Sequence, residues 1–350
     1  MRRILLLSNM FPHKNNVASG VFVEKMMNQL ISNDQFEINL CVLRPNRYKF
    51  LAYLWFYLRA LWSMIVMRDY VLYCHFVSHT GLLGLTGRYL FGKKVILNCH
   101  GSDIVIPAKT EGYIHKLNGI VLRCADKIIV PSNFFAQLVS EKFDIPMRNL
   151  FIYPSGGVFY PSNLEVSDHH WSKDRITFGY VGSLSIAKGV QIITKCMNHI
   201  DFRCRLIVAG PGDYELINSL TNSNVELVCH GVLDREGTNK VYEEIDVLLF
   251  PTLLEESLGL TPIEAMAFGV PVVASKIGAV TEYIEHEKNG FLIEPGSSDD
   301  LTKTLVLIKN LTQSEYASLS FEARTVAAKY DENKIVEEYR SVFRRECNVG

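Results

Sequence analysis

Residues 251–275 read PTLLEESLGLTPIEAMAFGVPVVAS and follow directly after the apolar run Val247–Phe250. The segment holds two glutamates, Glu256 and Glu264, then a predicted helix, and it ends in a second apolar run, Val272–Ala274. Two short apolar runs joined through a helix are typical of parallel strands in a β-α-β unit. In such a unit the loop after the first strand leads into the N-terminus of the helix, where ligands usually bind.

The same alternation of short apolar runs and helical periods continues on both sides of this segment. Strands that are apolar without alternation are expected to be buried on both faces, in a parallel sheet covered by helices. In the first half these predicted strands are Ile4–Ser8, Ile38–Leu43, Tyr70–Tyr73, Val95–Cys99, Lys127–Val130 and Leu150–Tyr153. In the second half they are Phe178–Val181, Leu206–Ala209, Val225–Cys229, Val247–Phe250, Val272–Ala274 and Phe291–Ile293. The sequence therefore predicts an α/β fold with two doubly wound, Rossmann-like domains.

The predicted domain boundary is the polar segment from Tyr160 to Arg175, which has no clear hydrophobic period. A chain of 350 residues exceeds what one hydrophobic core usually supports. We expect an N-terminal domain over 1–160, a C-terminal domain over 161–330, and a helix over 331–350 that packs back on the N-terminal domain. The carboxyl ends of the strands would then face a central cleft.

Composition and cysteine spacing exclude several classes of function. The net charge of −1 gives no bulk attraction to nucleic acid. The eight cysteines are scattered without metal-ligand spacing, so we expect reduced thiols in a cytoplasmic protein. Met1 to Arg3 carry the charge of a signal peptide, but the apolar run Ile4–Leu7 is too short for one and predicts a first strand.

Two interpretations of Glu264 follow from its position near a helix start. Thr261 suits an N-cap and Pro262 the first helical position, and Glu264 falls three residues after Thr261, as in a capping box. Alternatively, the helix N-terminus binds a diphosphate, which Leu258-Gly259-Leu260 would allow to approach closely. Glu256 would then face a sugar, and Glu264 would accept hydrogen bonds from ribose hydroxyls.

The two glutamates, with seven residues between them, resemble the E-x7-E signature of retaining glycosyltransferase family 4, which has the GT-B fold. The resemblance implies that Glu256 contacts the donor sugar, with a catalytic role, and that Glu264 contacts the ribose. Val181-Gly182-Ser183-Leu184, followed by Lys188-Gly189, resembles the family's phosphate-binding loop. It assigns donor binding to Gly182, Ser183 and Lys188, alongside Leu258, Gly259, Leu260 and Glu264. Ser183 stands where the family usually has an arginine, so one cation is missing.

A second part of the resemblance lies in the first half of the chain. Asn98 to Asp103 resemble the family's His-Gly-x-Asp turn, which makes His100 a catalytic residue that hydrogen-bonds the donor sugar. For His100 by itself, without the resemblance, a core or turn-stabilising histidine is the favoured interpretation. Asp103 is either an acceptor-side residue or a helix cap. Pro12 to Gly20 resemble the acceptor-side glycine loop, in which Gly20 precedes the helix.

The resemblance also implies the chemistry. We expect retention of anomeric configuration, with the leaving phosphate of a UDP- or GDP-sugar taking the acceptor proton. No D-x-D motif occurs, so no metal or other cofactor is expected. The implied process is the assembly of a bacterial surface polysaccharide such as lipopolysaccharide, capsule or exopolysaccharide, on a glycan or lipid-linked acceptor. Two alternatives are a GT-B nucleotide-sugar 2-epimerase and a catalytically inactive GT-B binding partner.

Residues 47–68 form an aromatic, apolar segment with basic flanks. A helix over Phe50–Met67 would just span a bilayer, but Arg59 lies near its centre and makes insertion unfavourable by roughly 2.5 to 3.5 kcal/mol. Arg47, Lys49 and Arg68 flank it. The segment is expected either to lie in the interface of the membrane, as a peripheral contact at its cytoplasmic face, or to be a buried crossover helix.

Overall fold

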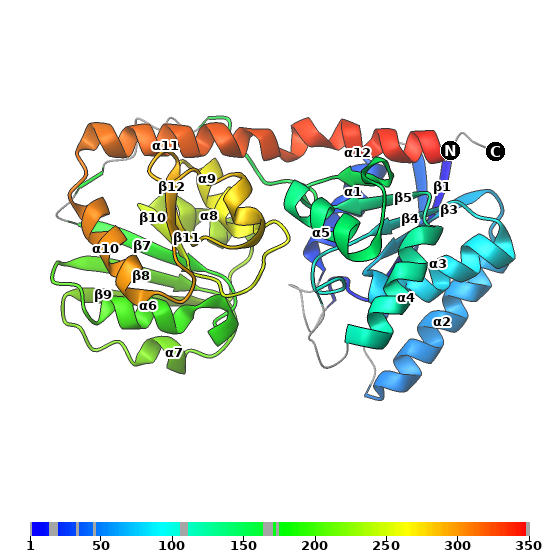
Figure 1. The fold of residues 1–350 in the computed structure, drawn as a ribbon, viewed down its shortest axis with the longest axis horizontal. Helices are drawn as coiled ribbons and strands as arrows, with labels where there is room; N and C mark the ends of the chain where they lie inside the picture. The colour runs from blue at the N-terminus through cyan, green and yellow to red at the C-terminus, as the bar shows by residue number, and fades with distance from the viewer. Residues whose placement is uncertain are drawn as a thin grey trace. The chain divides into compact units, whose positions relative to one another are not determined.

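The computed structural model describes residues 2–13, 20–32, 35–44, 47–105, 111–163, 171–172 and 175–347 (Figure 1). The chain divides into two compact units, one formed by 1–157 with 333–350 and the other by 158–332. Of the predicted boundary segment, 164–170 and 173–174 lie outside the described residues. The predicted C-terminal helix is present as α12 (Glu332–Glu346), which from Asn333 onward belongs to the first unit.

The first unit contains a six-stranded parallel sheet in the order β2-β1-β3-β4-β5-β6. Its strands are β1 (Arg2–Ser8), β2 (Phe36–Val42), β3 (Tyr70–His75), β4 (Val95–Asn98), β5 (Lys127–Val130) and β6 (Leu150–Ile152). Its further helices are α1 (Val21–Ile31), α2 (Lys49–Val66), α3 (Val77–Phe91), α4 (Glu111–Cys124) and α5 (Asn133–Phe143).

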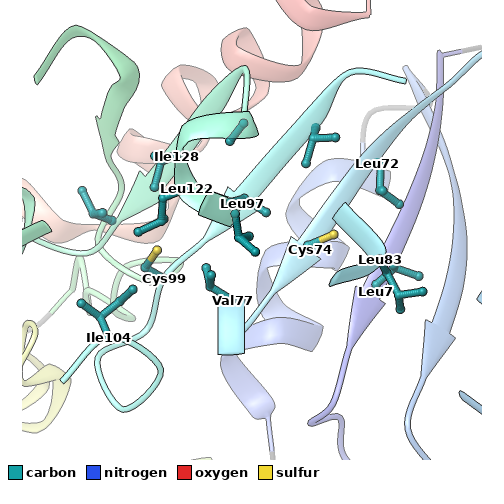
Figure 2. Packing of buried hydrophobic residues seen from close by; sticks show 14 of the residues in the cluster. Leu7, Leu72, Cys74, Val77, Leu83, Leu97, Cys99, Ile104, Leu122 and Ile128 are labelled. Carbon is teal, nitrogen blue, oxygen red and sulfur yellow. The ribbon is translucent and has the colours of Figure 1, made fainter. Parts of the chain in front are cut away.

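Alternate side chains of each strand enter opposite layers of the first unit. Leu5 and Leu7 of β1 pack in a core with α2, α3, α4 and α5, whereas Ile4 and Leu6 pack with α1 and α12. Figure 2 shows part of the first core, where Leu72 and Leu97 of the sheet lie with Val77 and Leu83 of α3. Both faces of the sheet are therefore buried, which explains why its strands are apolar throughout.

The second unit repeats this architecture with the strand order β12-β11-β10-β7-β8-β9. Its strands are β7 (Ile176–Val181), β8 (Cys204–Ala209), β9 (Val225–Gly231), β10 (Val247–Phe250), β11 (Val272–Ser275) and β12 (Gly290–Ile293). Its helices are α6 (Val190–Met197), α7 (Glu215–Asn218), α8 (Arg235–Glu244), α9 (Leu260–Ala267), α10 (Ser298–Lys309) and α11 (Gln313–Ala327). Helices α6 and α10 cover one face, and α8 and α9 cover the other.

Each of the twelve predicted strands is present, and the prediction of two doubly wound α/β domains is confirmed. All eight cysteines are free thiols, and six of them are buried. The first predicted strand is also present, because β1 begins at Arg2.

Helix α2 has one buried and one exposed face. Its buried side chains, Ala52, Phe56, Ala60 and Met64, recur every four residues, and the last three pack in the core with the sheet. The opposite side is an apolar face formed by Phe50, Leu51, Leu54, Trp55, Leu58, Trp62, Ile65 and Val66. Trp55 is 60% and Trp62 is 68% exposed, so the two indoles are not core residues. Within the described parts of the chain, all helices are too short or too polar to span a bilayer.

Candidate active site

The loop after β10 carries both glutamates of the quoted segment, and its geometry corrects the predicted start of the helix. Helix α9 begins at Leu260, with Gly259 as its N-cap and no side-chain cap. The capping box built on Thr261 was therefore wrong. The reason is conformational, because Gly259 has a φ of 76°, in the left-handed region that glycine enters without strain. Glu264 consequently lies within the helix.

Glu256 is paired with the lysine of the predicted phosphate-binding loop. The Nζ atom of Lys188 lies 2.6 Å from Oε1 of Glu256. The Thr252 hydroxyl donates to the same oxygen at 3.0 Å. The two charged side chains are 26% and 16% exposed, so the pair is largely shielded but open to an incoming ligand. Residues 68 apart in sequence thus form one ion pair at the carboxyl ends of the paired strands β7 and β10.

The loop after β7 is held against the loop after β10 by backbone contacts. Leu253 N donates to Ala187 O at 2.9 Å. Gly189 follows the short 3-10 helix Ile186–Lys188 with a φ of 77°, and a Cβ atom there would lie 1.8 Å from the Pro251 carbonyl oxygen. Only glycine permits this approach. In the same loop the Tyr180 hydroxyl donates to Ser183 O at 2.7 Å, and Gly182 has a φ of 153°.

Glu264 accepts a hydrogen bond from the hydroxyl of Tyr242 on α8, at 3.0 Å from Oε2. Burial and the neighbouring Glu264 raise the pKa of Tyr242 well above its usual value, so the phenol stays protonated and donates. This partner of Glu264 was not predicted from the sequence. A tyrosine hydroxyl holds one carboxylate oxygen in place, which orients Glu264 for a second contact.

Tyr283 fixes the turn before α9. Its hydroxyl donates to the carbonyl oxygens of Leu258 and Gly259, both at 3.0 Å. These bonds hold the predicted Leu258-Gly259-Leu260 turn, at which α9 begins without a side-chain cap. Tyr283 lies beyond the quoted segment, and nothing in its sequence surroundings marked it as a partner.

His100 lies in the first unit, directly beyond β4. Its ring contacts those of Phe22 and Phe76, with centroid distances of 4.7 and 4.5 Å. Nδ1 of His75 lies 3.0 Å from its Nε2. Burial lowers the pKa of His100 to about 3, so the ring is neutral near pH 7 and acts through hydrogen bonding rather than charge.

The two predicted acceptor-side residues have structural contacts in the first unit. Asp103 is 1% exposed and accepts from the backbone N–H groups of His100, Gly101 and Val77, each at 3.0 Å. Val77 is the first residue of α3, so these contacts favour the helix-capping alternative for Asp103. Gly20 precedes α1 with a φ of 71°, where a Cβ atom would lie 2.8 Å from Met10 O. Residues 14–19 of the predicted glycine loop lie outside the described residues.

In the part of the chain that the structure describes, no three His, Cys, Asp or Glu side chains are grouped as metal ligands. Lys188 supplies a cation in the loop after β7 and is paired with Glu256, the first of the two glutamates of the E-x7-E segment. This arrangement of a cation, two carboxylates and a helix N-terminus suits an anionic ligand that also carries hydroxyl groups.

Several known proteins that are similar to this chain are glycosyltransferases. A family model described as Glycosyl transferases group 1 matches residues 175–310. An uncharacterized glycosyltransferase of Methanocaldococcus jannaschii is 28% identical over 251 residues, which cover 66% of this chain and 64% of that protein. The lipopolysaccharide 1,2-N-acetylglucosaminetransferase of Salmonella typhimurium is 23% identical, over 61% of this chain and 60% of that protein. The matched regions thus span just under two thirds of these relatives.

The fold comparison covers nearly the whole chain. The crystal structure of Anabaena HepE in complex with UDP superposes with a TM-score of 0.74 at 16% identity, covering 99% of this chain and 100% of that chain. The chain has the GT-B fold of this structure, and its second unit is similar to glycosyl transferases of group 1. The residues matched by the family model include Lys188, Glu256 and Glu264, whereas His100 lies outside them.

Tyr242 and His75 are the partners that sequence reasoning missed most clearly. A signal for His75 existed, because it ends the apolar run of β3 just as His100 follows that of β4. Adjacent parallel strands bring such residues to one edge of a sheet. For Tyr242, on a polar helix, no comparable signal existed.

Proposed function

We propose that this protein is a glycosyltransferase that transfers a sugar from a UDP- or GDP-sugar to a glycan or lipid-linked acceptor, with retention of configuration. The observation that carries the proposal is the Lys188–Glu256 pair beside the uncapped N-terminus of α9. Bacterial surface-polysaccharide assembly is the proposed process. It is supported by the similarity to a lipopolysaccharide N-acetylglucosaminetransferase and by the UDP-bound structure of similar fold.

In the proposed donor complex, Lys188 and the backbone N–H groups at the start of α9 neutralise the diphosphate. Glu264, oriented by Tyr242, accepts hydrogen bonds from the ribose hydroxyls. Glu256 leaves Lys188 and contacts the sugar, while Gly182 and Ser183 line the phosphate side. The contacts to the diphosphate stabilise the transition state most, because negative charge develops on this leaving group as its bond to the sugar breaks.

The proposed reaction needs no covalent intermediate on the protein. The acceptor hydroxyl attacks the anomeric carbon on the face that the diphosphate leaves, and the departing phosphate oxygen takes the hydroxyl proton. The carboxylate of Glu256 stabilises the positive charge that develops on the sugar ring. Neutral His100 donates or accepts a hydrogen bond at a sugar hydroxyl and is not required to carry charge.

A panel of nucleotide-sugars tests this function directly. We expect a UDP- or GDP-sugar, but not an ADP-sugar, to raise the melting temperature, because a ligand at 100 times its Kd stabilises a protein by about 2.7 kcal/mol. Release of nucleoside diphosphate that requires an added acceptor would distinguish a transferase from an epimerase. A chain that binds the donor but neither hydrolyses nor transfers it would be an inactive binding partner, and the proposal would fail.

Replacing Glu264 with glutamine should raise the donor KM more than it lowers kcat. A ribose contact is made equally in the ground state and in the transition state, so its loss appears in binding. The lost charge-assisted bonds are worth about 1.5 to 3 kcal/mol, or roughly 10- to 100-fold in KM. Steady-state kinetics with the preferred donor measures the effect. Tyr242→Phe, which removes only the orienting hydroxyl, should shift KM in the same direction by less, and a fall confined to kcat would contradict the assignment.

We also propose that the apolar face of α2 contacts a membrane surface as a peripheral attachment. Trp55 and Trp62 are exposed, and Arg47, Lys49 and Arg68 lie at or beyond the helix ends. Aromatic side chains suit the headgroup region, and basic residues attract acidic lipids. A lipid-linked acceptor would be presented at such a surface.

A further inference from the structure

His75 is a fully buried residue in direct contact with the proposed catalytic His100. It ends β3, is 0% exposed, and its Nδ1 lies 3.0 Å from Nε2 of His100. The two ring planes differ by only 11°, and their centroids are 5.2 Å apart. With this short N···N distance, nearly parallel planes place the rings edge to edge. The shared hydrogen then lies in the plane of both rings, which is the favourable geometry for an imidazole pair.

Both rings are neutral in the folded protein. Burial lowers the pKa of His75 well below its usual value, with a further contribution from His100, and it lowers that of His100 to about 3. Each neutral ring carries one N–H, and only one of the two N–H groups can occupy the shared bond. The donor in that bond therefore decides which nitrogen of His100 is protonated.

The surroundings of His75 favour one of the two arrangements. Among the residues that the structure describes, Nε2 of His75 has no hydrogen-bond partner, and it is shielded from solvent. If His100 were the donor, this nitrogen would carry a buried N–H without an acceptor. If His75 donates from Nδ1, it is instead an unprotonated ring nitrogen. Orphaned buried N–H groups are the rarer case in proteins, so His75 is the donor.

We propose that His75 is a positioning residue that holds His100 in the tautomer protonated at Nδ1 and fixes the plane of its ring. Phe22 and Phe76 also contact the ring of His100, but their hydrocarbon rings do not select a tautomer. The in-plane hydrogen bond from His75 selects the tautomer of His100, in the same way that an outer hydrogen-bond partner orients a metal-binding histidine. The proposal rests on the proposed function, in which His100 hydrogen-bonds the donor sugar.

The test uses His75→Leu, which removes the bond, and His75→Asn, whose amide can still donate near the position of Nδ1. Imidazole ¹⁵N chemical shifts of histidine-labelled full-length protein report the tautomer without any substrate. We expect unprotonated Nε2 and protonated Nδ1 on His100 in the wild type and in His75→Asn, and a mixture of tautomers in His75→Leu. In His75→Leu, kcat should fall about 10- to 100-fold with little change in the donor KM, and His75→Asn should recover most of it.

His79→Leu is the matched control. His79 lies on α3, and its ring pairs with the Tyr53 hydroxyl rather than with His100. This variant should leave both the His100 tautomer and kcat unchanged. The melting temperatures of all variants show whether a fall in kcat comes from unfolding of the protein or from loss of the orientation of the His100 ring.

The outcomes distinguish this proposal from the proposed function. An Nε2-protonated His100 in the wild type, or an unchanged tautomer and kcat in His75→Leu, overturns the role of His75. If the tautomer shifts as expected in His75→Leu but His100→Ala retains full kcat, the pairing stands and the catalytic role of His100 fails.

Discussion

Replacing Glu256 with glutamine should lower kcat by about 100-fold or more, the range for loss of one preorganised electrostatic group, while strengthening the binding of UDP. The two effects have different causes. In turnover the carboxylate stabilises positive charge on the sugar, which the amide cannot do. Without donor, the same carboxylate is bound to Lys188 at 2.6 Å, so a diphosphate must compete with it. Removing the charge of Glu256 leaves Lys188 available to bind the diphosphate of UDP.

Calorimetric titration with UDP and steady-state kinetics measure the two effects separately. Glu255→Gln is the matched control, since this neighbouring glutamate is exposed and the substitution changes the net charge equally. It should alter neither quantity appreciably. Near-normal turnover of Glu256→Gln would eliminate the catalytic assignment, and unchanged UDP affinity with low kcat would show that the ion pair does not compete with the diphosphate.

The double substitution Trp55→Ser and Trp62→Ser should release the protein from anionic vesicles while leaving it folded and able to hydrolyse donor. Both indoles are exposed, so their loss removes little core packing. Each flanking basic residue contributes up to about 1 kcal/mol near an acidic surface, and salt screens that attraction beyond roughly 10 Å at 0.1 M. Binding of the parent protein should therefore weaken in high salt. Vesicle co-sedimentation measures both effects.

Two control substitutions test whether an effect on vesicle binding is specific to the apolar face of α2. Phe56→Ser changes a buried residue of the same helix and should destabilise the fold by about 3 to 5 kcal/mol. Phe321→Ser removes an exposed aromatic residue of the second unit and should not affect vesicle binding. If the parent protein does not bind vesicles, or if the tryptophan variant unfolds, the membrane proposal is excluded.

The contacts of the donor side show where sequence reasoning was limited. The start of α9 was misplaced because Thr261-Pro262 is a favourable helix start by composition, whereas the backbone enters the helix through Gly259. A glycine in a sequence does not indicate which backbone conformation it adopts. The φ of 76° at Gly259 depends on the path of the whole loop. The roles given to Lys188, Glu256 and Glu264 stay predictions until they are tested by substitution.

The sequence by itself determined the two parallel sheets, because burial on both faces requires strands that are apolar throughout, and this requirement is visible in each run. It did not determine which side chains meet. Lys188 and Glu256 are 68 residues apart, and Tyr339 of α12 bonds the Tyr73 hydroxyl across 266 residues. The first pair depends on strand order, through the pairing of β7 with β10, and the second depends on the packing of α12 against the first sheet. That order is set by packing of the whole unit, so only the tertiary structure could reveal it.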